Sequence, residues 1–396
     1  VDVTVLEASS RTGGRTWTRD TLGVPVDMGA SWIEGADHNP TMSIVRSAGI
    51  RTVVSEDDVA VYADGDRVAD ADISNALRRF GGALERARAW AEDVPDTDPS
   101  LDRALRSTGT DLRRADGLLQ LAAVSELDDE CAASAAELSA WNYDSDDALD
   151  GDFLLLPGGY VQVVKQLATG LEIEHEVEVT RIRSRASGGA LVTARDGREW
   201  SADRVVVAVP LTQLRELRFV PALPAAHRTS MYRLGMGTFN KVALRFDERF
   251  WPDVDTVAIG DRRSIVREWL NMERVVGEPV LLGLAGGDAG RWVEAHDDRT
   301  VRRRVLAEMS RAAGVAVPDP TGIDIQRWGS EPFIGGSYSY RPPGASMADH
   351  AALAEPIDVH VALAGEATDP EFPSTVHGAI RSGRRAARDV LRARVN

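Results

Sequence analysis

The chain contains 396 residues, which exceeds the roughly 250 to 300 at which a single hydrophobic core stops growing, so we expect two domains. Its formal net charge of −16 argues against nucleic-acid binding, which requires a basic face. The same charge fits either simple solubility or the attraction of cationic substrates. No run approaches the ~20 apolar residues of a membrane span, and the single cysteine and scattered histidines predict neither an internal disulfide nor a metal centre.

The first residues, VDVTVL, predict a buried strand that ends at Glu7, and a segment with paired glycines, ASSRTGGRT, follows it. In a dinucleotide-binding βαβ unit, an acid at the end of the second strand accepts hydrogen bonds from ribose hydroxyls, and bare glycine backbone lies close to an anion. Glu7, Gly13 and Gly14 suit these positions, and Arg11 and Arg15 can donate to a pyrophosphate. An ordinary turn is the alternative interpretation of the same residues.

Two helical regions are predicted before the middle of the chain. Apolar residues at helical spacing predict a helix over 70–93, followed by a proline-containing break, and a second helical stretch covers 100–141. The segment 177–210 contains short alternating runs and an Asp196-Gly197 turn. This pattern predicts a meander of antiparallel strands that ends at Pro210.

The last part of the chain returns to strands and ends in a helix. Residues 240–250 and 279–285 predict strands of a second sheet, 301–313 a helix, and 360–368 a buried strand that runs into a polar turn. The C-terminal segment predicts an amphipathic helix with Ser374 and Thr375 as available caps. Its apolar face consists of Val376, Ile380, Ala387, Val390 and Leu391.

Lysine is rare in this sequence. Of the 46 basic residues, all but Lys165 and Lys241 are arginines. A chain that uses lysine so sparingly is expected to need it where it is kept.

Five separated segments, in the same order, resemble the flavin-dependent amine oxidases, the family of monoamine oxidase, the polyamine oxidases and the lysine-specific histone demethylases. Region 50–145 shares little with that family beyond its helical character. The five segments are LEASSRTGGRTWT at 6–18, VDMGASWIEG with the following NP at 26–40, FNKVALRFDERFW at 239–251, RWGSEPFIGGSYSY at 327–340 and AGEATDPEFPSTVHGAIRSGRRAA at 364–387.

The resemblance implies FAD as the cofactor, and it implies noncovalent binding because Cys131 lies outside the C-terminal segment where monoamine oxidases attach their flavin. A helix N-terminus at Thr375 and Val376 would also suit the pyrimidine end of the ring, where reduction places negative charge. The implied contacts are Glu7 with the adenosine ribose, Arg11, Gly14 and Arg15 with the pyrophosphate and flavin edge, Gly29 and Ala30 with the ring, Val177 with adenine, Glu366 with the ribityl chain, and the backbone of Thr375 and Val376 with the pyrimidine end.

The resemblance also implies a substrate side. Lys241 matches a lysine that holds a water against the reactive ring nitrogen and assists reoxidation by oxygen. Glu34 could bind an ammonium group or help to deprotonate the amine, and the alternative is a surface acid. Tyr338 matches an aromatic residue that flanks the amine, while Thr375 stands where monoamine oxidases have a second tyrosine, which favours polyamine-like or peptide-like amines over small aryl amines. The acidic run at 144–152 fits a solvated loop or a cation entrance.

We therefore expect an α/β fold with a Rossmann-like FAD-binding domain and a mixed sheet-plus-helix substrate domain. The FAD-binding domain is expected to comprise 1–45, 151–230 and 350–396, and the substrate domain 46–150 and 231–349. The strand and Gly-x-Gly-x-x-Gly turn that should precede Val1 by about thirty residues are missing from the sequence. Without them we expect a sheet that lacks its central strand, and either a fragment or a chain that holds FAD weakly.

The expected function is oxidation of a small cationic amine, with polyamines such as spermidine or spermine preferred and molecular oxygen as acceptor, giving an imine or aldehyde and hydrogen peroxide. One alternative is an L-amino-acid oxidase or another desaturase of the same flavoprotein superfamily, although no motif identifies the arginine clamp that an amino-acid carboxylate needs. The other is an inactive truncated fragment or an interaction module. We expect a cytoplasmic location and no nucleic-acid partner.

Overall fold

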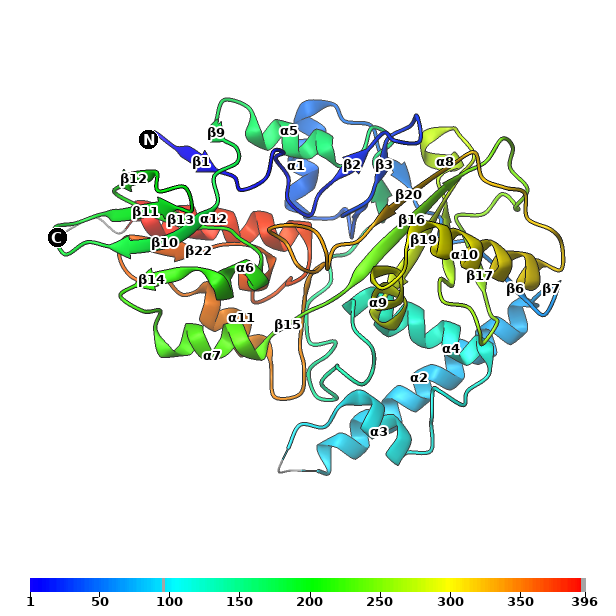
Figure 1. Cartoon of the computed structure of the whole chain (residues 1–396). Coiled ribbons are helices and arrows are strands. Elements are labelled where there is room, and N and C mark those ends of the chain that lie inside the picture. The colour runs from blue at the N-terminus through cyan, green and yellow to red at the C-terminus, as the bar shows by residue number, and fades with distance from the viewer. Residues whose placement is uncertain (95–96, 393–396) are drawn as a thin grey trace.

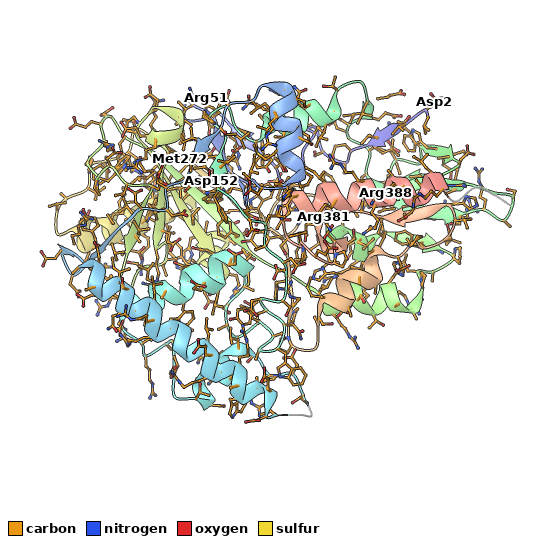
Figure 2. All side chains as sticks on the ribbon, turned by 180° about the vertical axis from the view of Figure 1, so that it is seen from behind. Asp2, Arg51, Asp152, Met272, Arg381 and Arg388 are labelled. Carbon is orange, nitrogen blue, oxygen red and sulfur yellow. The ribbon has the colours of Figure 1, made fainter. Side chains whose placement is uncertain are left out.

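The computed structural model describes residues 1–94 and 97–392. It is a mixed α/β fold in which a large sheet with its helices occupies one side and smaller sheets with α12 (Val376–Arg392) occupy the other (Figure 1). Seen from behind, α12, marked by Arg381 and Arg388, runs from the centre towards the side that carries β1 (Thr4–Leu6) and Asp2 (Figure 2). None of the described helices is long and apolar enough to cross a bilayer.

The large sheet has seven strands, antiparallel except where β6 pairs with β17 in parallel. Strands β16 and β19 confirm the predicted strands at 240–250 and 279–285, although β16 ends at Arg245. In sheet order the strands are β20 (Gly322–Gln326), β16 (Phe239–Arg245), β19 (Val280–Gly286), β18 (Glu268–Asn271), β17 (Thr256–Ile259), β6 (Val59–Ala63) and β7 (Asp66–Arg67).

Alternate residues of the large sheet face opposite sides, as the strand period of two requires. On one side, Val242 and Leu244 pack in a core with Val301 and Val305 of α10 (Asp298–Ala313), the helix predicted at 301–313. This core also contains a residue of α9 (Gly287–Glu294), Val293. The other side therefore carries the odd-numbered residues of β16, including Lys241.

The smaller sheets contain two parallel strand pairs. β1, the strand predicted before Glu7, pairs with β9 (Glu172–Glu174), but it is partly exposed and not buried as expected. β13 (Val205–Val207) pairs with β22 (Val361–Leu363), the buried strand predicted near 360. Among the described residues, β1 and β13 each have a strand partner on one edge only. Within residues 1–94 and 97–392 the two pairs form separate two-stranded sheets.

The meander prediction for 177–210 is confirmed in part. β10 (Val179–Ser184), β11 (Ala190–Ala194) and β12 (Glu199–Ala202) are antiparallel neighbours, and β14 (Arg218–Val220) joins β10 in parallel. The prediction was wrong for β13, because a short valine-rich run does not reveal its pairing partner and this one pairs with β22. Pro210 lies beyond β13 and precedes α6 (Leu211–Glu216).

The helical region contains more breaks than the sequence pattern indicated. The predicted helix at 70–93 is α2 (Asp70–Glu92), but the stretch 100–141 divides into α3 (Leu101–Ser107), α4 (Gly117–Ala123) and the π-helical turn Val124–Asp129. The other helices are α1 (Pro40–Ala48), α5 (Val161–Ala168), α7 (Ala225–Arg233), α8 (Glu273–Val276), α11 (Met347–Ala354) and the 3₁₀ turn Glu366–Thr368. The short strands are β2 (Thr18–Arg19), β3 (Val26–Asp27), β4 (Trp32–Ile33), β5 (Val53–Val54), β8 (Leu154–Leu155), β15 (Gly235–Met236) and β21 (Ser339–Tyr340).

The predicted C-terminal helix is α12, and Thr375 caps it by accepting a hydrogen bond from Gly378 N at 2.9 Å. Ser374 instead has a φ of 68° and bonds to Ser339. The buried face of α12 is formed by small and polar residues rather than by the predicted apolar stripe, because close packing against β22 needs small side chains such as Ala386. Most of the predicted apolar stripe lines the cavity described next: Val376, Ala387, Val390 and Leu391.

Candidate active site

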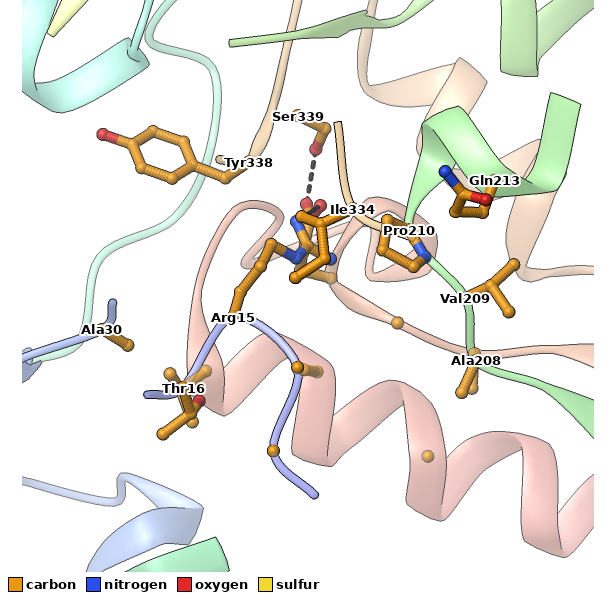
Figure 3. A pocket seen from close by; sticks show the side chains of 18 of the residues that line it. Arg15, Thr16, Ala30, Ala208, Val209, Pro210, Gln213, Ile334, Tyr338 and Ser339 are labelled. Carbon is orange, nitrogen blue, oxygen red and sulfur yellow. Dashed lines mark hydrogen bonds and ion pairs between the residues drawn. The ribbon is translucent and has the colours of Figure 1, made fainter. Parts of the chain in front are cut away.

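A single cavity of about 2110 Å³ brings together every site residue that the sequence predicted. These residues come from the N-terminal segment, β16, the segment before β21 and the start of α12. Figure 3 shows Arg15, Tyr338 and Ser339 around the same space, with Pro210 and Gln213 on its other side. The predicted residues that line the cavity are Glu7, Arg11, Gly14, Arg15, Gly29, Ala30, Glu34, Val177, Lys241, Tyr338, Glu366, Thr375 and Val376.

The cavity is larger than the roughly 300 to 1,000 Å³ of an ordinary small-molecule pocket. Part of this volume lies between the two parallel strand pairs, because residues 1–6 and 205–209 both line the cavity.

The end of the cavity that is predicted to hold the nucleotide offers an acceptor, bare backbone and cationic donors. Glu7 Oε1 accepts hydrogen bonds from Ser9 N and Ser9 Oγ, both at 2.8 Å, which hold the carboxylate at the end of β1. Gly14 has a φ of +56°, and a Cβ added there would meet no atom within 4 Å. The backbone at Gly14 consequently borders open space in the cavity, where a side chain would occupy volume that a ligand can use.

The two arginines beside the glycines are held by the protein in different ways. Arg11 Nη1 donates to Gly14 O at 2.7 Å, and its guanidinium lies 3.9 Å from the ring centroid of Trp17. Arg15 Nη1 donates to Glu366 Oε1 at 2.7 Å and to Ser337 O at 2.9 Å. Neither cation is therefore a free surface charge, and each presents its remaining N–H groups from a fixed position.

Glu366, in the 3₁₀ turn, binds side-chain and backbone groups from three separate segments at this end of the cavity. Its Oε2 accepts hydrogen bonds from Ser339 Oγ at 2.6 Å and from Ser374 N at 2.9 Å. Although burial opposes its charge, the Arg15 guanidinium and the Ser339 hydroxyl hold the pKa of Glu366 below its ordinary value. The ionised carboxylate thus joins the N-terminal segment, the segment at β21 and the start of α12.

The start of α12 supplies an anion site of its own. The first N–H groups of a helix have no intrahelical acceptor, and Thr375 Oγ1 satisfies only that of Gly378. The N–H groups of Val376 and His377 remain for a ligand, and both residues line the cavity. Together with the arginines, the bare glycine and the predicted ribose acceptor Glu7, these N–H groups fit a flavin dinucleotide.

Lys241 lies beneath the predicted flavin-side loop and is 1% exposed. Its Nζ donates to Asp27 O at 3.2 Å, to Gly29 O at 2.6 Å and to the hydroxyl of Ser31. Burial lowers the pKa of the Lys241 ammonium, and the buried carboxylate of Asp27 opposes that shift. These acceptors use the ammonium's three hydrogens, so a water bound at Nζ has to replace one of them.

The end of the cavity that is predicted to bind the substrate contains Glu34 and Tyr338. Burial, and then the charges of Glu130 and Asp146, raise the pKa of Glu34 to about 7. The hydroxyl of Tyr338 donates to Asp129 O at 2.6 Å, which fixes its ring at one wall. Thr375 lines the same cavity, but its hydroxyl donates to Phe372 O and caps α12, so its side-chain oxygen is already used within the protein.

Several cavity residues were missed at the sequence level. Asp129 and Glu130 lie in or beside the π-helical turn, Glu268 lies on β18, and none of the three forms an ion pair within the described part of the chain. Sequence alone carries no signal for them, because only strand register and the π-helical turn direct them inward. Of the acidic run at 144–152, Asp144, Asp146 and Asp147 line the cavity, which favours the interpretation as a cation entrance.

Cys131 also lines the cavity, beside Glu130 on the substrate side. Burial, and then the charge of Glu130, raise the pKa of the Cys131 thiol to about 12. The thiol therefore stays protonated at neutral pH, which does not favour its action as a nucleophile.

The chain matches the family model of flavin containing amine oxidoreductases over residues 1–391. It is 32% identical to polyamine oxidase 4 of Oryza sativa subsp. japonica, covering 100% of this chain and 84% of that protein. It is 31% identical to a lysine-specific histone demethylase 1 homolog of the same plant, covering 99% of this chain and 54% of that protein. A solved structure of putrescine oxidase with bound putrescine aligns with a TM-score of 0.80 at 19% identity, covering 98% of this chain and 93% of that chain.

Proposed function

The chain belongs to the flavin containing amine oxidoreductase family and is an FAD-dependent amine oxidase, and from this premise we propose that it oxidises polyamines with molecular oxygen as acceptor. When bound, FAD supplies the acceptor for a hydride from the carbon beside the amine nitrogen and returns two electrons to oxygen. The products are an imine, which water hydrolyses to an aldehyde, and hydrogen peroxide. Spermidine and spermine are the preferred candidates.

The observation that carries this proposal is the charge of the cavity wall around Tyr338. Glu34, Asp129, Glu130 and Glu268 line that wall, and none is ion-paired with a described basic residue. Carboxylates enclosed without a counter-ion favour a ligand that brings positive charge. Two of the similar proteins are named a polyamine oxidase and a putrescine oxidase, which supports the same substrate class.

We assign cofactor binding and substrate binding to residues at opposite ends of the cavity. Arg11, Arg15 and the start of α12 bind the negatively charged parts of the dinucleotide, and Glu366 orients Arg15. On the substrate side, Glu34 accepts a hydrogen bond from the ammonium and can take a proton at its carboxylate before the carbon is oxidised. Lys241 places a fixed cation under the loop that contains Gly29 and favours electron transfer to oxygen.

An amino-acid oxidase fits the same wall poorly. A substrate carboxylate would need an arginine there. Arg341 does line the cavity, but its guanidinium already donates to Asn142 O, Tyr143 O and Asp146. The acidic wall would also repel a substrate carboxylate.

The test is an oxidation screen of the purified chain after incubation with FAD. We expect bound flavin absorbance, and peroxide release with spermidine, spermine or putrescine but little with L-amino acids. Peroxide from amino acids in preference to amines would reverse the substrate assignment. A protein that takes up no FAD would instead support the inactive-fragment interpretation.

A further inference from the structure

The charge of Lys241 depends on a carboxyl group buried behind the cavity wall. Asp27, on β3, is 5% exposed, and the residues from Gly29 to Trp32 form the adjacent wall of the cavity. The backbone oxygen of Asp27 accepts a hydrogen bond from Lys241 Nζ at 3.2 Å. Its carboxylate binds other partners, so it acts on the ammonium group through its charge.

The carboxylate of Asp27 is fixed between β2 and the start of α5. Its Oδ1 accepts hydrogen bonds from the Thr18 hydroxyl and from Tyr160 N, the latter at 3.0 Å. The Thr18 hydroxyl in turn accepts a hydrogen bond from Val161 N at 3.0 Å. These donors favour the ionised form of the carboxyl group and hold it in one position.

Asp27 and Lys241 are a buried pair whose charges stabilise each other. Burial raises the pKa of Asp27 to about 6, although its hydrogen bonds and the charge of Lys241 oppose this shift. Burial lowers the pKa of Lys241 to about 8, and the Asp27 carboxylate opposes that shift. Both groups are therefore ionised between about pH 6 and pH 8.

The described side chains nearest to Lys241 in the sheet are uncharged. Its strand partners are Leu284 on β19 and Gln326 on β20, and the ring of Trp32 lies 5.2 Å from Nζ. The charged groups on the same face of the sheet or in adjoining segments are Arg245, paired with Glu278, Asp324, paired with Arg19, and the cavity residues Glu34, Glu268 and Glu331. Within the part of the chain that the structure describes, Asp27 supplies the charge that shifts the pKa of Lys241.

The reaction with oxygen makes the charge of Lys241 important. Oxygen takes two electrons from the reduced flavin and two protons to become hydrogen peroxide, and its first one-electron product is the superoxide anion. A fixed cation nearby stabilises that anion, whereas a neutral amine does not. Lys241 thus assists only in the fraction of molecules in which Nζ is protonated.

We propose that Asp27 is a positioning residue for the oxygen reaction, which keeps Lys241 charged and holds its Nζ beneath the loop at Gly29 without touching cofactor or substrate. This inference rests on the proposed function, because it assumes oxygen as the acceptor. It deepens that function by assigning a role to a residue behind the cavity wall. Without the Asp27 carboxylate, Lys241 would be a buried cation that has lost its counter-ion, and it would lose its proton at a lower pH.

The first test measures the charge of Lys241 directly, because Lys165 and Lys241 are the only lysines in the sequence. In protein labelled with ¹³C at the lysine Cε atoms, NMR should show two lysine signals, and Lys241→Met identifies one of them by its loss. We expect the Lys241 signal of the wild type to titrate near pH 8. In Asp27→Asn its pKa should be lower by about 1 to 2, while the exposed Lys165 titrates as before.

The wild type provides a second measurement that does not depend on the folding of a variant. When Asp27 takes up its proton near pH 6, the Lys241 signal should show a second, smaller change. Asp324→Asn is the matched control, because it removes a carboxylate from the neighbouring strand β20 and should leave the titration of Lys241 unchanged. Neither measurement requires bound flavin or activity.

The second test follows reoxidation of the reduced, FAD-loaded protein by oxygen in a stopped-flow instrument. At pH 7.5 the rate should fall roughly 3- to 25-fold in Asp27→Asn, because a smaller fraction of Lys241 is charged, and at pH 6 it should return to within about twofold of the wild type. A general structural defect would not be reversed by acid. In the Lys241→Met background, Asp27→Asn should change the rate less than about twofold.

A Lys241 pKa that is unchanged in Asp27→Asn, or a wild-type signal without the change near pH 6, would overturn the proposal. A lowered pKa with an unchanged reoxidation rate at pH 7.5 would remove the role in the oxygen reaction. If oxygen does not reoxidise the reduced protein at all, the proposed function fails and this role fails with it. NMR would then still show separately whether Asp27 maintains the charge of Lys241.

Discussion

Glu34 offers a test in which pH reports directly on one carboxyl group. Burial, and then the charges of Glu130 and Asp146, raise its pKa from 4.5 to about 7. An ammonium substrate binds the ionised carboxylate and not the neutral acid. Because the raised pKa keeps Glu34 neutral in mild acid, kcat/KM for a cationic amine should rise as the pH increases through about 7.

The size of this effect follows from the fraction of Glu34 that is ionised. With a pKa of about 7, roughly a tenth of the carboxyl groups are ionised at pH 6 and roughly nine tenths at pH 8. The expected rise in kcat/KM between these values is therefore about tenfold. In Glu34→Gln this rise should disappear, and the value at pH 8 should fall roughly 10- to 100-fold, because a charge-assisted hydrogen bond to the substrate is lost.

The raised pKa of Glu34 also makes the stability of the folded protein depend on pH. Between the ordinary pKa of 4.5 and about 7, the folded protein binds more protons at Glu34 than the unfolded chain does, so stability falls as the pH rises across this window. The difference between the two pKa values corresponds to at most about 3 kcal/mol. Urea unfolding of the wild type and Glu34→Gln at pH 4.5 and pH 7.5 measures it.

The assay combines steady-state oxidation of one amine from pH 5.5 to 9 with those unfolding curves. Asp147→Asn serves as the control, since it removes an exposed charge at the cavity mouth and should keep the rise near pH 7. If Glu34→Gln retains that rise with the same midpoint, another group controls amine binding and the assignment of Glu34 is wrong.

The remaining predictions concern the oxygen reaction, the glycines and the helix cap. Lys241→Met should slow reoxidation of the reduced flavin roughly 10- to 1,000-fold in stopped-flow experiments while leaving anaerobic reduction by the amine within about threefold, and equal reoxidation rates would contradict its role. A Cβ at Gly29 would lie 1.9 Å from Arg15 O, so Gly29→Ala should lower the thermal midpoint strongly. Gly14→Ala meets no atom but is strained at a φ of 56°, so it should lower the midpoint less and should also lose flavin absorbance. Thr375→Ala should cost about 1 kcal/mol in urea unfolding by removing the cap, and an unchanged midpoint would refute that.

The parts of the site that the sequence predicted are those encoded in short continuous segments. Glu7 follows a valine-rich strand, the glycines and arginines lie within a few residues of it, and Thr375 stands just before an amphipathic run. In each case local geometry decides the position, since a strand end, a turn and a helix start are formed by neighbours in sequence. Lys241 was found by a different signal, the scarcity of lysine together with its surrounding motif.

The parts that were not predicted depend on contacts between distant segments. Glu268 faces the cavity only because β18 pairs with β19 in the observed register, and a shift of one residue would turn it to the opposite side. Asp129 points inward because a π-helical turn replaces α-helix at the end of α4, and no pattern of apolar residues indicates such a turn. The pairing of Val205–Val207 with β22 was missed for the same reason.

The acidic residues that distant segments bring into the cavity, Glu34, Asp129 and Glu268, say more about the substrate than any single sequence motif does. The predicted dinucleotide end consists of backbone groups and arginines that suit many anions, so its residues indicate a class of cofactor but not a substrate. Glu34, Asp129 and Glu268 reach one cavity from a loop, a helical turn and a strand, and burial raises the pKa of each carboxyl group, so its ionised form is costly there without a cation. A bound cation would lower that cost, and this is the physical reason why the proposed polyamine substrate rests on these three carboxyl groups.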